Sequence, residues 1–302
     1  MDGDEPNSLA FDTSGNLIGT TFWTGTLFNL SLTSTSPQLS NLFTYTSTTG
    51  EGPEQILIDA QNDVYGATGG LNLSGCVYRI SSGNFTALHV FGSLPNDGAP
   101  PAGGLIADTS GELYGATGNG GSNAFGTVFK IAKDGTGYTI LHSFTSSESR
   151  YPMGIALGND GFIYGVTLGS IPQDAGCVFR MHPDGSSFQV IHTFSWNDTA
   201  GGVYPGGAIA LGSGRIYGST SYGGQGNEGV VFSLNADGTS YQVLYSFPYQ
   251  QHPPASTPRA WYPDGGNVTS LILDSGKIYG TTYIGGTFDG GVLFSMQADG
   301  SG

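Results

Sequence analysis

The chain has 302 residues, 52 of them glycine, and it contains 10% charged and 12% aromatic residues. This composition excludes a disordered chain, because disorder goes with high charge and few aromatic side chains. The formal net charge is −15, with only eight lysines and arginines. That balance argues against binding to nucleic acid, because phosphates require clustered cations. We expect partners that are neutral or cationic.

Nothing in the sequence predicts insertion into a membrane. A spanning helix needs about 18 or more consecutive apolar residues, and the chain has no such run. Its start, Met1–Glu5, is acidic and lacks the apolar region of a signal peptide. We therefore expect either a cytosolic protein or one whose leader is absent from this chain.

A short apolar segment with Tyr-Gly at its centre recurs along the chain. Measured between the tyrosines, with Ile18 as their equivalent in a degenerate first copy, the successive spacings are 47, 49, 50, 53 and 62 residues. Such spacings are typical of the blades of a propeller. The copies are Leu17–Thr21, Val64–Thr68, Leu113–Thr117, Ile163–Thr167, Ile216–Thr220 and Ile278–Thr282.

Each copy contains four short apolar segments, which are clearest in the third copy. There the last segment alternates with the strand period of two, and the Asp134-Gly135 turn before it is a strong hairpin signal. We therefore predict four antiparallel strands in each copy and no long helix. In chain order the four strands of the third copy are expected at Gly104–Asp108, Glu112–Thr117, Gly126–Ile131 and Tyr138–Phe144.

Six such units could form a β-propeller, a β-solenoid or a string of sandwiches. Solenoid coils are usually shorter, and a single four-stranded sheet cannot cover its own faces, whereas radial packing covers them. The sequence therefore predicts an all-β, six-bladed β-propeller that forms one domain over residues 1–302. The sixth copy reaches Asp299–Gly302 where its fourth strand should begin. We expect a three-stranded last blade, or a chain cut from a longer protein.

The repeated unit resembles that of a known family. The stretch Asp134–Phe144, together with the recurring Leu-Tyr-Gly-Ala-Thr, Gly-Gly and Gly-Thr-Val-Phe-Lys-Ile, resembles the GloVer (Gloeo/Verruco) tandem repeat, and the order of strands resembles NHL propellers. The resemblance covers nearly the whole chain. It implies an extracellular bacterial propeller, secreted or displayed on the cell surface, and it carries no catalytic residues.

Residues that recur at one position in most copies are interpreted as scaffold. His89, His142 and His192 all occupy the fourth strand, and Cys76 and Cys177 both begin a third strand, where we expect two free thiols. The aspartates of the turns and hairpins also recur and are expected to bond backbone N–H groups. We therefore predict no metal site and no cofactor, with turn-bound calcium as the alternative.

Residues that break the repeat gather in the loops after the second and fourth strands, which share one face of a propeller. These loops hold aromatic residues that could stack on sugar rings, since an aromatic face matches the C–H face of a pyranose. The alternative is that the rings pack their own loops onto the blades. The predicted ligand-binding residues are Trp23, Trp196, Tyr204, Tyr222, Trp261, Tyr262 and Tyr283.

A second polar set is expected at the mouth of the channel, just before the inner strands. It comprises Asn7, Glu54, Gln55 and Thr269, of which Glu54 alone is ionisable. Glu54 could bind an ion or a ligand hydroxyl, or it could be a solvated carboxylate in a wet channel.

These features favour a module that recognises a carbohydrate or surface glycan. One alternative is a glycosidase, which needs two carboxylates across the sugar, or a polysaccharide lyase with a histidine base beside an arginine. No pair is marked out by its spacing, so the sequence leaves open whether the protein is an enzyme. The other alternative is a structural or protein-interaction segment of a larger surface protein. The candidate catalytic residues are Glu54, Asp198, Asp264, His252 and Arg259.

Overall fold

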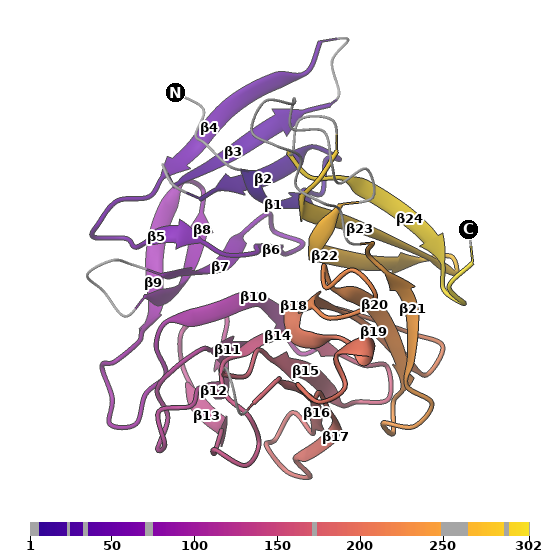
Figure 1. Cartoon of the computed structure of the whole chain (residues 1–302). Coiled ribbons are helices and arrows are strands. Elements are labelled where there is room, and N and C mark those ends of the chain that lie inside the picture. The colour runs from indigo at the N-terminus through magenta and orange to yellow at the C-terminus, as the bar shows by residue number, and fades with distance from the viewer. Residues whose placement is uncertain are drawn as a thin grey trace, which may run out of the picture. The chain divides into compact units, whose positions relative to one another are not determined.

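The computed structural model describes residues 6–22, 25–32, 36–69, 75–170, 174–248, 265–286 and 290–301. The chain divides into two compact units, Met1–Phe144 and Thr145–Gly302, each of which contains three antiparallel blades (Figure 1). The predicted fold class is therefore confirmed: the chain is an all-β, six-bladed β-propeller. That the six blades form one domain stays a prediction.

The first unit holds blades one to three, and within each blade the strands pair in sequence order. In blade two the inner strand is split into two short pieces, β5 and β6. The strands are β1 (Pro6–Phe11), β2 (Leu17–Thr21), β3 (Thr26–Ser31) and β4 (Gln38–Thr44); β5 (Glu51–Pro53), β6 (Leu57–Ile58), β7 (Val64–Gly69), β8 (Cys76–Ser81) and β9 (Asn84–Val90); and β10 (Pro101–Ala107), β11 (Glu112–Thr117), β12 (Thr127–Ala132) and β13 (Thr139–Ser143).

The second unit holds blades four to six. Blade six has three strands, as predicted, and the described residues contain one short 3₁₀ helix, η1 (Thr199–Gly201). The strands are β14 (Pro152–Leu157), β15 (Ile163–Thr167), β16 (Cys177–Met181) and β17 (Gln189–Thr193); β18 (Val203–Gly212), β19 (Arg215–Tyr222), β20 (Val230–Asn235) and β21 (Gln242–Ser246); and β22 (Gly266–Asp274), β23 (Lys277–Ile284) and β24 (Leu293–Gln297).

The glycine of the repeated Tyr-Gly is explained by an aromatic ring that lies close to its backbone. In every blade the glycine of the second strand lies opposite an aromatic residue of the third strand. A Cβ atom on any of these glycines would come within 2.3–2.4 Å of the far end of the aromatic side chain. Only glycine fits. The pairs are Gly19 with Phe28, Gly66 with Tyr78, Gly115 with Phe129, Gly165 with Phe179, Gly218 with Phe232 and Gly280 with Phe294.

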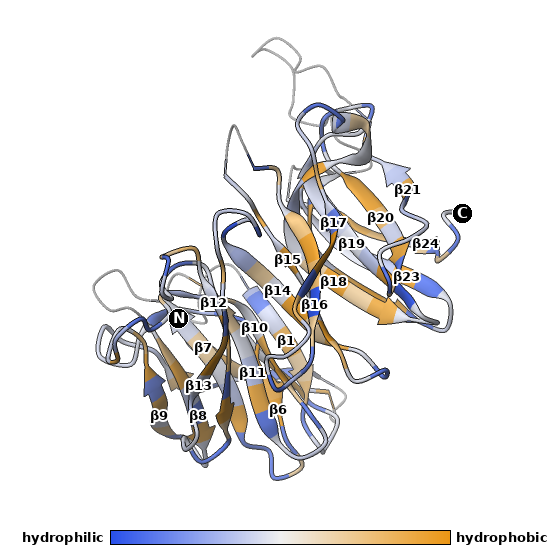
Figure 2. Cartoon of the chain, turned by 90° about the horizontal axis from the view of Figure 1, so that it is seen from below, coloured by the Kyte–Doolittle hydropathy of each residue, from blue (hydrophilic) through white to orange (hydrophobic). Residues whose placement is uncertain are grey.

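Apolar side chains from successive blades meet in buried clusters. In the first unit Leu105 of blade three packs with Val77 and Phe91 of blade two, and in the second unit Val203 and Phe232 of blade five pack with Tyr164 of blade four. Apolar residues follow the strands, while the turns are largely hydrophilic (Figure 2). The core therefore lies between the blades.

The recurring polar residues act as scaffold. Asp108 Oδ1 accepts hydrogen bonds from the backbone N–H groups of Ser110 and Glu112, at 2.9 and 3.0 Å. Asp134 Oδ1 accepts from the N–H and hydroxyl groups of Thr136, at 2.9 and 2.6 Å. These bonds confirm the predicted turn role. In the described part of the chain no three His, Cys, Asp or Glu residues gather as metal ligands.

Both cysteines are buried free thiols, as predicted. Burial raises the pKa of both, and that of Cys177 rises to about 12. The Cys177 thiol donates to the Glu148 carbonyl at 3.2 Å. Because the thiolate is the reactive form, we assign both cysteines to packing.

Candidate functional site

The structure brings three of the predicted ligand-binding aromatics together in the second unit. The ring centroids of Trp196 and Tyr204 lie 5.6 Å apart, and those of Tyr204 and Tyr222 lie 6.0 Å apart, both edge-to-face. Trp196 comes from the loop after β17, Tyr204 from the start of β18 and Tyr222 from the end of β19. We call these three residues the aromatic cluster.

The cluster contains a strained residue. Tyr204 has a φ of +62° and is followed by Pro205, a combination that bulky residues rarely adopt. Its N–H donates to the Ala175 carbonyl at 3.0 Å, which ties it to blade four. The same turn recurs in blade four, where Tyr151 has a φ of +58° and precedes Pro152, so this conformation belongs to the scaffold of the blade. The ring of Tyr204 is therefore held between its two neighbours by the backbone.

The two ends of the cluster differ in exposure. Tyr222 is 44% exposed, whereas Trp196 packs partly against the apolar core of blades four and five. The indole N–H of Trp196 is buried, and no group among the described residues accepts a hydrogen bond from it. Trp196 thus packs against its own blades, while Tyr222 presents a ring to solvent, and ligand binding by the cluster stays a prediction.

Of the other predicted aromatics, the structure describes Tyr283. Tyr283 stands on β23 in blade six and is 68% exposed. Trp23, Trp261 and Tyr262 lie outside the described residues, as do the candidate catalytic residues Asp264, His252 and Arg259.

The two described candidate catalytic carboxylates belong to different units. Asp198 is exposed in the second unit, directly before η1, and its charge contributes, after burial, to the raised pKa of Tyr241. Glu54 belongs to the first unit. Neither unit therefore pairs two of the predicted catalytic residues that are described.

Glu54 lies in the break between β5 and β6, where its N–H donates to the Ala67 carbonyl at 2.8 Å. Burial raises the pKa of its carboxyl group to about 7. Blade one holds both ends of the break. The Asn7 side chain donates to the Pro53 carbonyl at 2.7 Å, and the Ser8 hydroxyl accepts from the Ile56 N–H at 3.0 Å.

The remaining predicted mouth residues make local contacts. A Cβ atom on Gly104 would lie 2.6 Å from that of Gln55, so the glycine of blade three makes room for this side chain. Thr269, in the second unit, shares a hydrogen bond of 2.8 Å with the Thr281 hydroxyl. That these residues line a common channel mouth stays a prediction.

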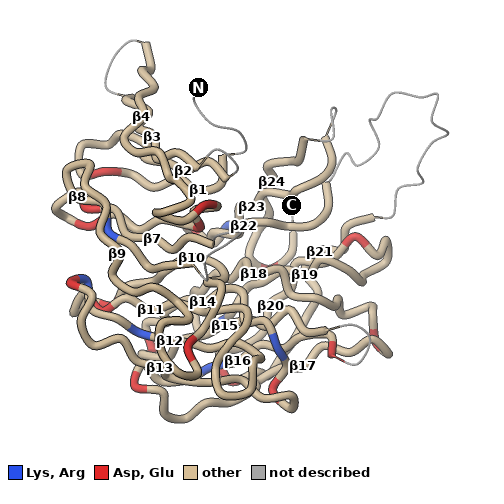
Figure 3. Tube along the Cα trace, turned by 90° about the vertical axis from the view of Figure 1, so that its left-hand side faces the viewer, with Lys and Arg blue, Asp and Glu red and all other residues tan. Residues whose placement is uncertain are grey.

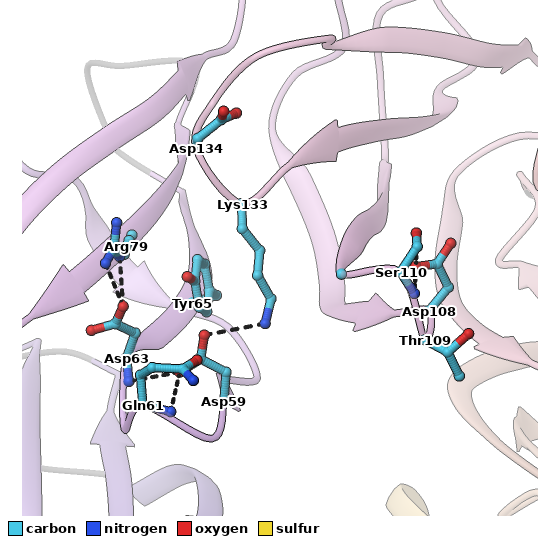
Figure 4. A pocket seen from close by; sticks show the side chains of 11 residues that line it. Asp59, Gln61, Asp63, Tyr65, Arg79, Asp108, Thr109, Ser110, Lys133 and Asp134 are labelled. Carbon is cyan, nitrogen blue, oxygen red and sulfur yellow. Dashed lines mark hydrogen bonds and ion pairs between the residues drawn. The ribbon is translucent and has the colours of Figure 1, made fainter.

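Sequence reasoning missed a polar pocket in the first unit. A pocket of about 500 Å³ lies between the turns of blades two and three, and Figure 4 shows side chains from both blades around it. These turns follow the first and third strands of their blades, whereas the sequence predicts the aromatic ligand-binding residues in the loops after the second and fourth strands. Asp59, Asp108 and Asp134 line the pocket, although the repeat had assigned all three to scaffold.

Lys133 is the signal that could have revealed this pocket. The residues at its position in the next three copies are Pro183, Ala236 and Ala298, so its charge breaks the repeat. Its ammonium group lies 3.2 Å from Asp59 Oδ2 in the preceding blade.

A family model described as the Gloeobacter/Verrucomicrobia repeat matches residues 1–169 and 151–302. No curated protein matches the chain. None of the described segments forms a helix long and apolar enough to cross a bilayer.

Solved structures share the fold at low identity. The PQQ-bound aldose sugar dehydrogenase of Streptomyces coelicolor is 15% identical with a TM-score of 0.61, covering 96% of this chain and 93% of that one. A gluconolactonase of Xanthomonas campestris is 13% identical with a TM-score of 0.58, covering 97% and 86%. A B. thetaiotaomicron structure named as the extracellular domain of a hybrid two component system is 14% identical with a TM-score of 0.63, covering 97% and 35%.

Proposed function

The chain belongs to the Gloeobacter/Verrucomicrobia repeat family, and from that premise we propose that it is a secreted or surface-displayed module that binds a carbohydrate or surface glycan through the aromatic cluster. The observation that carries this proposal is the convergence of Trp196, Tyr204 and Tyr222 from three segments of the chain. Unlike the buried rings that join the blades, this cluster includes a ring, Tyr222, that is 44% exposed.

The chemistry of the cluster suits a neutral sugar. The half-exposed ring of Tyr222 offers an apolar face for the C–H groups of a pyranose. Asn197 and Asp198 follow Trp196 in the chain and are exposed, so their side chains can bond sugar hydroxyls. The low content of lysine and arginine fits a ligand without strong negative charge.

An extracellular location is supported by the similarity to an extracellular domain and by the resemblance of the repeat. A glycosidase or lyase is the alternative function. The similar folds include a dehydrogenase and a lactonase, but a shared fold does not transfer an activity. Binding is favoured because the aromatic cluster is formed by described residues, whereas no pair of candidate carboxylates is described within either unit.

A glycan array followed by calorimetric titration of the best ligand tests the proposal. We expect Tyr222→Ala to weaken binding by about tenfold or more, because the loss of 1.4 kcal/mol of stacking energy is tenfold in affinity. Trp196→Phe should weaken binding less, since it keeps an aromatic anchor in the loop.

Tyr245→Ala is the matched control. Tyr245 lies on the outer strand β21 and is 37% exposed, similar to Tyr222, but it is not part of the aromatic cluster. The proposal is wrong if the array shows no ligand, or if Tyr222→Ala binds as tightly as Tyr245→Ala. Release of reducing sugars from the bound glycan would instead support the enzymatic alternative.

A further inference from the structure

We infer that the polar pocket between blades two and three binds a small, neutral ligand rich in hydroxyl groups, of the monosaccharide or cyclic polyol class. This site is separate from the aromatic cluster, which lies in the other unit. The inference rests on the walls of the pocket, on one residue that breaks the repeat, and on the balance of charges around the cavity.

The pocket is walled by three turns and two strands of the first unit. Asp59 and Asp63 come from the turn of blade two, and Asp108 from the corresponding turn of blade three (Figure 4). Tyr65 on β7 and Arg79 on β8 close the side toward blade two. The pocket has a volume of about 500 Å³ and is widely open to solvent, so a ligand would lie in a surface depression between the turns.

Lys133 joins the two blades across this pocket. Its ammonium group lies 3.2 Å from Asp59 Oδ2 and 5.0 Å from the centroid of the Tyr65 ring. An ammonium group has three donors, and the side chain of Lys133 remains 32% exposed. The lysine can therefore hold Asp59 and still donate to a ligand in the pocket.

Arg79 supplies a second set of donors from the other side. Its Nε atom donates to Asp63 Oδ2 at 2.9 Å, and its side chain is 38% exposed. Lysine and arginine are sparse along the chain (Figure 3), and only eight occur in 302 residues. Two of these cations line one pocket. Arg79 occupies a third-strand position that is also basic in blades three and four, as Lys130 and Arg180, so of the two cations Lys133 is the one that breaks the repeat.

The charge balance selects a neutral ligand. Four aspartates and two cations line the pocket, so its net charge is negative and disfavours an anion. A metal ion is also disfavoured, because no three His, Cys, Asp or Glu residues gather as metal ligands among the described residues.

A ligand hydroxyl group matches the donors and acceptors that line the pocket. It can accept from Lys133 or Arg79 and donate to a carboxylate, because each hydroxyl is both donor and acceptor. The side chains of Gln61 and Thr109, which also line the pocket, add further polar groups of both kinds. Several hydroxyls on one small ring would satisfy these groups together, as in a monosaccharide or a cyclic polyol.

The test is calorimetric titration of the full chain with D-glucose, D-galactose, D-mannose and myo-inositol as separate probes. We expect at least one probe to bind with wild-type protein, and Lys133→Met to bind it at least tenfold more weakly. Lys130→Met is the matched control, because Lys130 lies on β12, three residues before Lys133, and outside the residues that line the pocket. Gln61→Ala serves as a second variant, since the turn uses only the backbone N–H of Gln61.

The result also separates this site from the aromatic cluster. Tyr222→Ala should leave binding of the probe unchanged, even if it abolishes binding of the glycan found on the array. The inference is overturned if none of the four probes binds, if both Lys133→Met and Gln61→Ala bind as wild type does, or if Tyr222→Ala removes the probe signal. Binding of inorganic phosphate or calcium in place of the probes would also overturn it.

Discussion

The boundary between blades two and three and the boundary between blades four and five are built in the same way. At the first, His89 stacks on Tyr138 of the next blade with centroids 3.5 Å apart and planes at 10°. At the second, His192 stacks on Tyr241 at 4.1 Å and 2°. His89 and His192 are therefore part of the scaffold at both boundaries, as their recurrence in the repeat predicted.

The two boundaries differ in what the loops place against this stack. The hydroxyl of Tyr138 donates to Asp97 Oδ1 at 2.6 Å, and Asp97 also bonds His89 at 2.9 Å. The hydroxyl of Tyr241 donates instead to the carbonyl of Gly201 in η1. One boundary carries a buried carboxylate and the polar pocket, and the other carries the aromatic cluster. Residues of the strands thus form the packing that both boundaries share, while residues of the loops differ between the two boundaries.

The largest effect should be the same at both boundaries. Phe129→Ala and Phe232→Ala each remove a ring that is fully buried and that fills the space above a glycine. We expect each variant to lower the free energy of unfolding by about 3–5 kcal/mol. Calorimetric melting of both variants checks this expectation. A loss below about 1 kcal/mol for only one of them would break the equivalence of the boundaries.

The next effect should distinguish the boundaries. Tyr138→Phe removes a hydrogen bond to a carboxylate that is 1% exposed, and we expect a loss of about 1.5–3 kcal/mol in stability. Tyr241→Phe removes a bond to a neutral carbonyl and should cost only about 0.5–1.5 kcal/mol. The two variants can be compared by thermal melting at one pH. Equal losses would show that Asp97 adds nothing beyond a neutral acceptor.

Much of the scaffold could be predicted because the repeat itself acts as a comparison. Strand order, the buried thiols and the turn aspartates follow from positions that recur in most copies. The aromatic cluster could also be anticipated in part, since Trp196 lies in the loop after β17, and Tyr204 and Tyr222 lie at the ends of strands that border such loops.

The polar pocket could not be predicted by comparing the copies of the repeat. Asp59 and Asp108 recur as turn residues, and their use as pocket walls depends on how two blades stack. Lys133 reaches Asp59 across 74 positions of sequence, a distance at which no local pattern links them. The candidate catalytic set stays a prediction, because Glu54 and Asp198 belong to separate units and the other candidates lie outside the described residues.

A smaller effect should appear with pH at the boundary of blade two. Burial raises the pKa of Glu54 from 4.5 to about 7, so the folded state holds more protons than the unfolded state within that window. Stability should therefore fall as the pH rises from 4.5 to 7. The full shift corresponds to at most about 3 kcal/mol, and we expect about 1–2 kcal/mol because the half-buried carboxyl group still reaches solvent.

Glu54→Gln should remove this dependence, and Glu112→Gln, in the neighbouring blade, is the control. Melting temperatures between pH 4.5 and 8 provide the measurement. The equivalent position in blade four is the uncharged Met153, so this position contributes no pH dependence to the stability of blade four. A wild-type slope that Glu54→Gln leaves unaltered would show that the carboxyl group is not desolvated.

The smallest effect should have the opposite sign and belong to the boundary of blades four and five. Burial lowers the pKa of His192 below 6.5. Its imidazole stacks on Tyr241, whose hydroxyl bonds the Gly201 carbonyl, whereas Tyr138 bonds the buried carboxylate of Asp97. The unfolded state then binds more protons than the folded state below pH 6.5, so stability is present above that pH and declines as the pH falls. His192→Gln should reduce the decline on the acid side while leaving the slope caused by Glu54 intact. A variant that reproduces the wild-type curve from pH 7 to pH 5 would show that the pKa of His192 is the same in the folded and unfolded states. The two boundaries would then differ only in their loops.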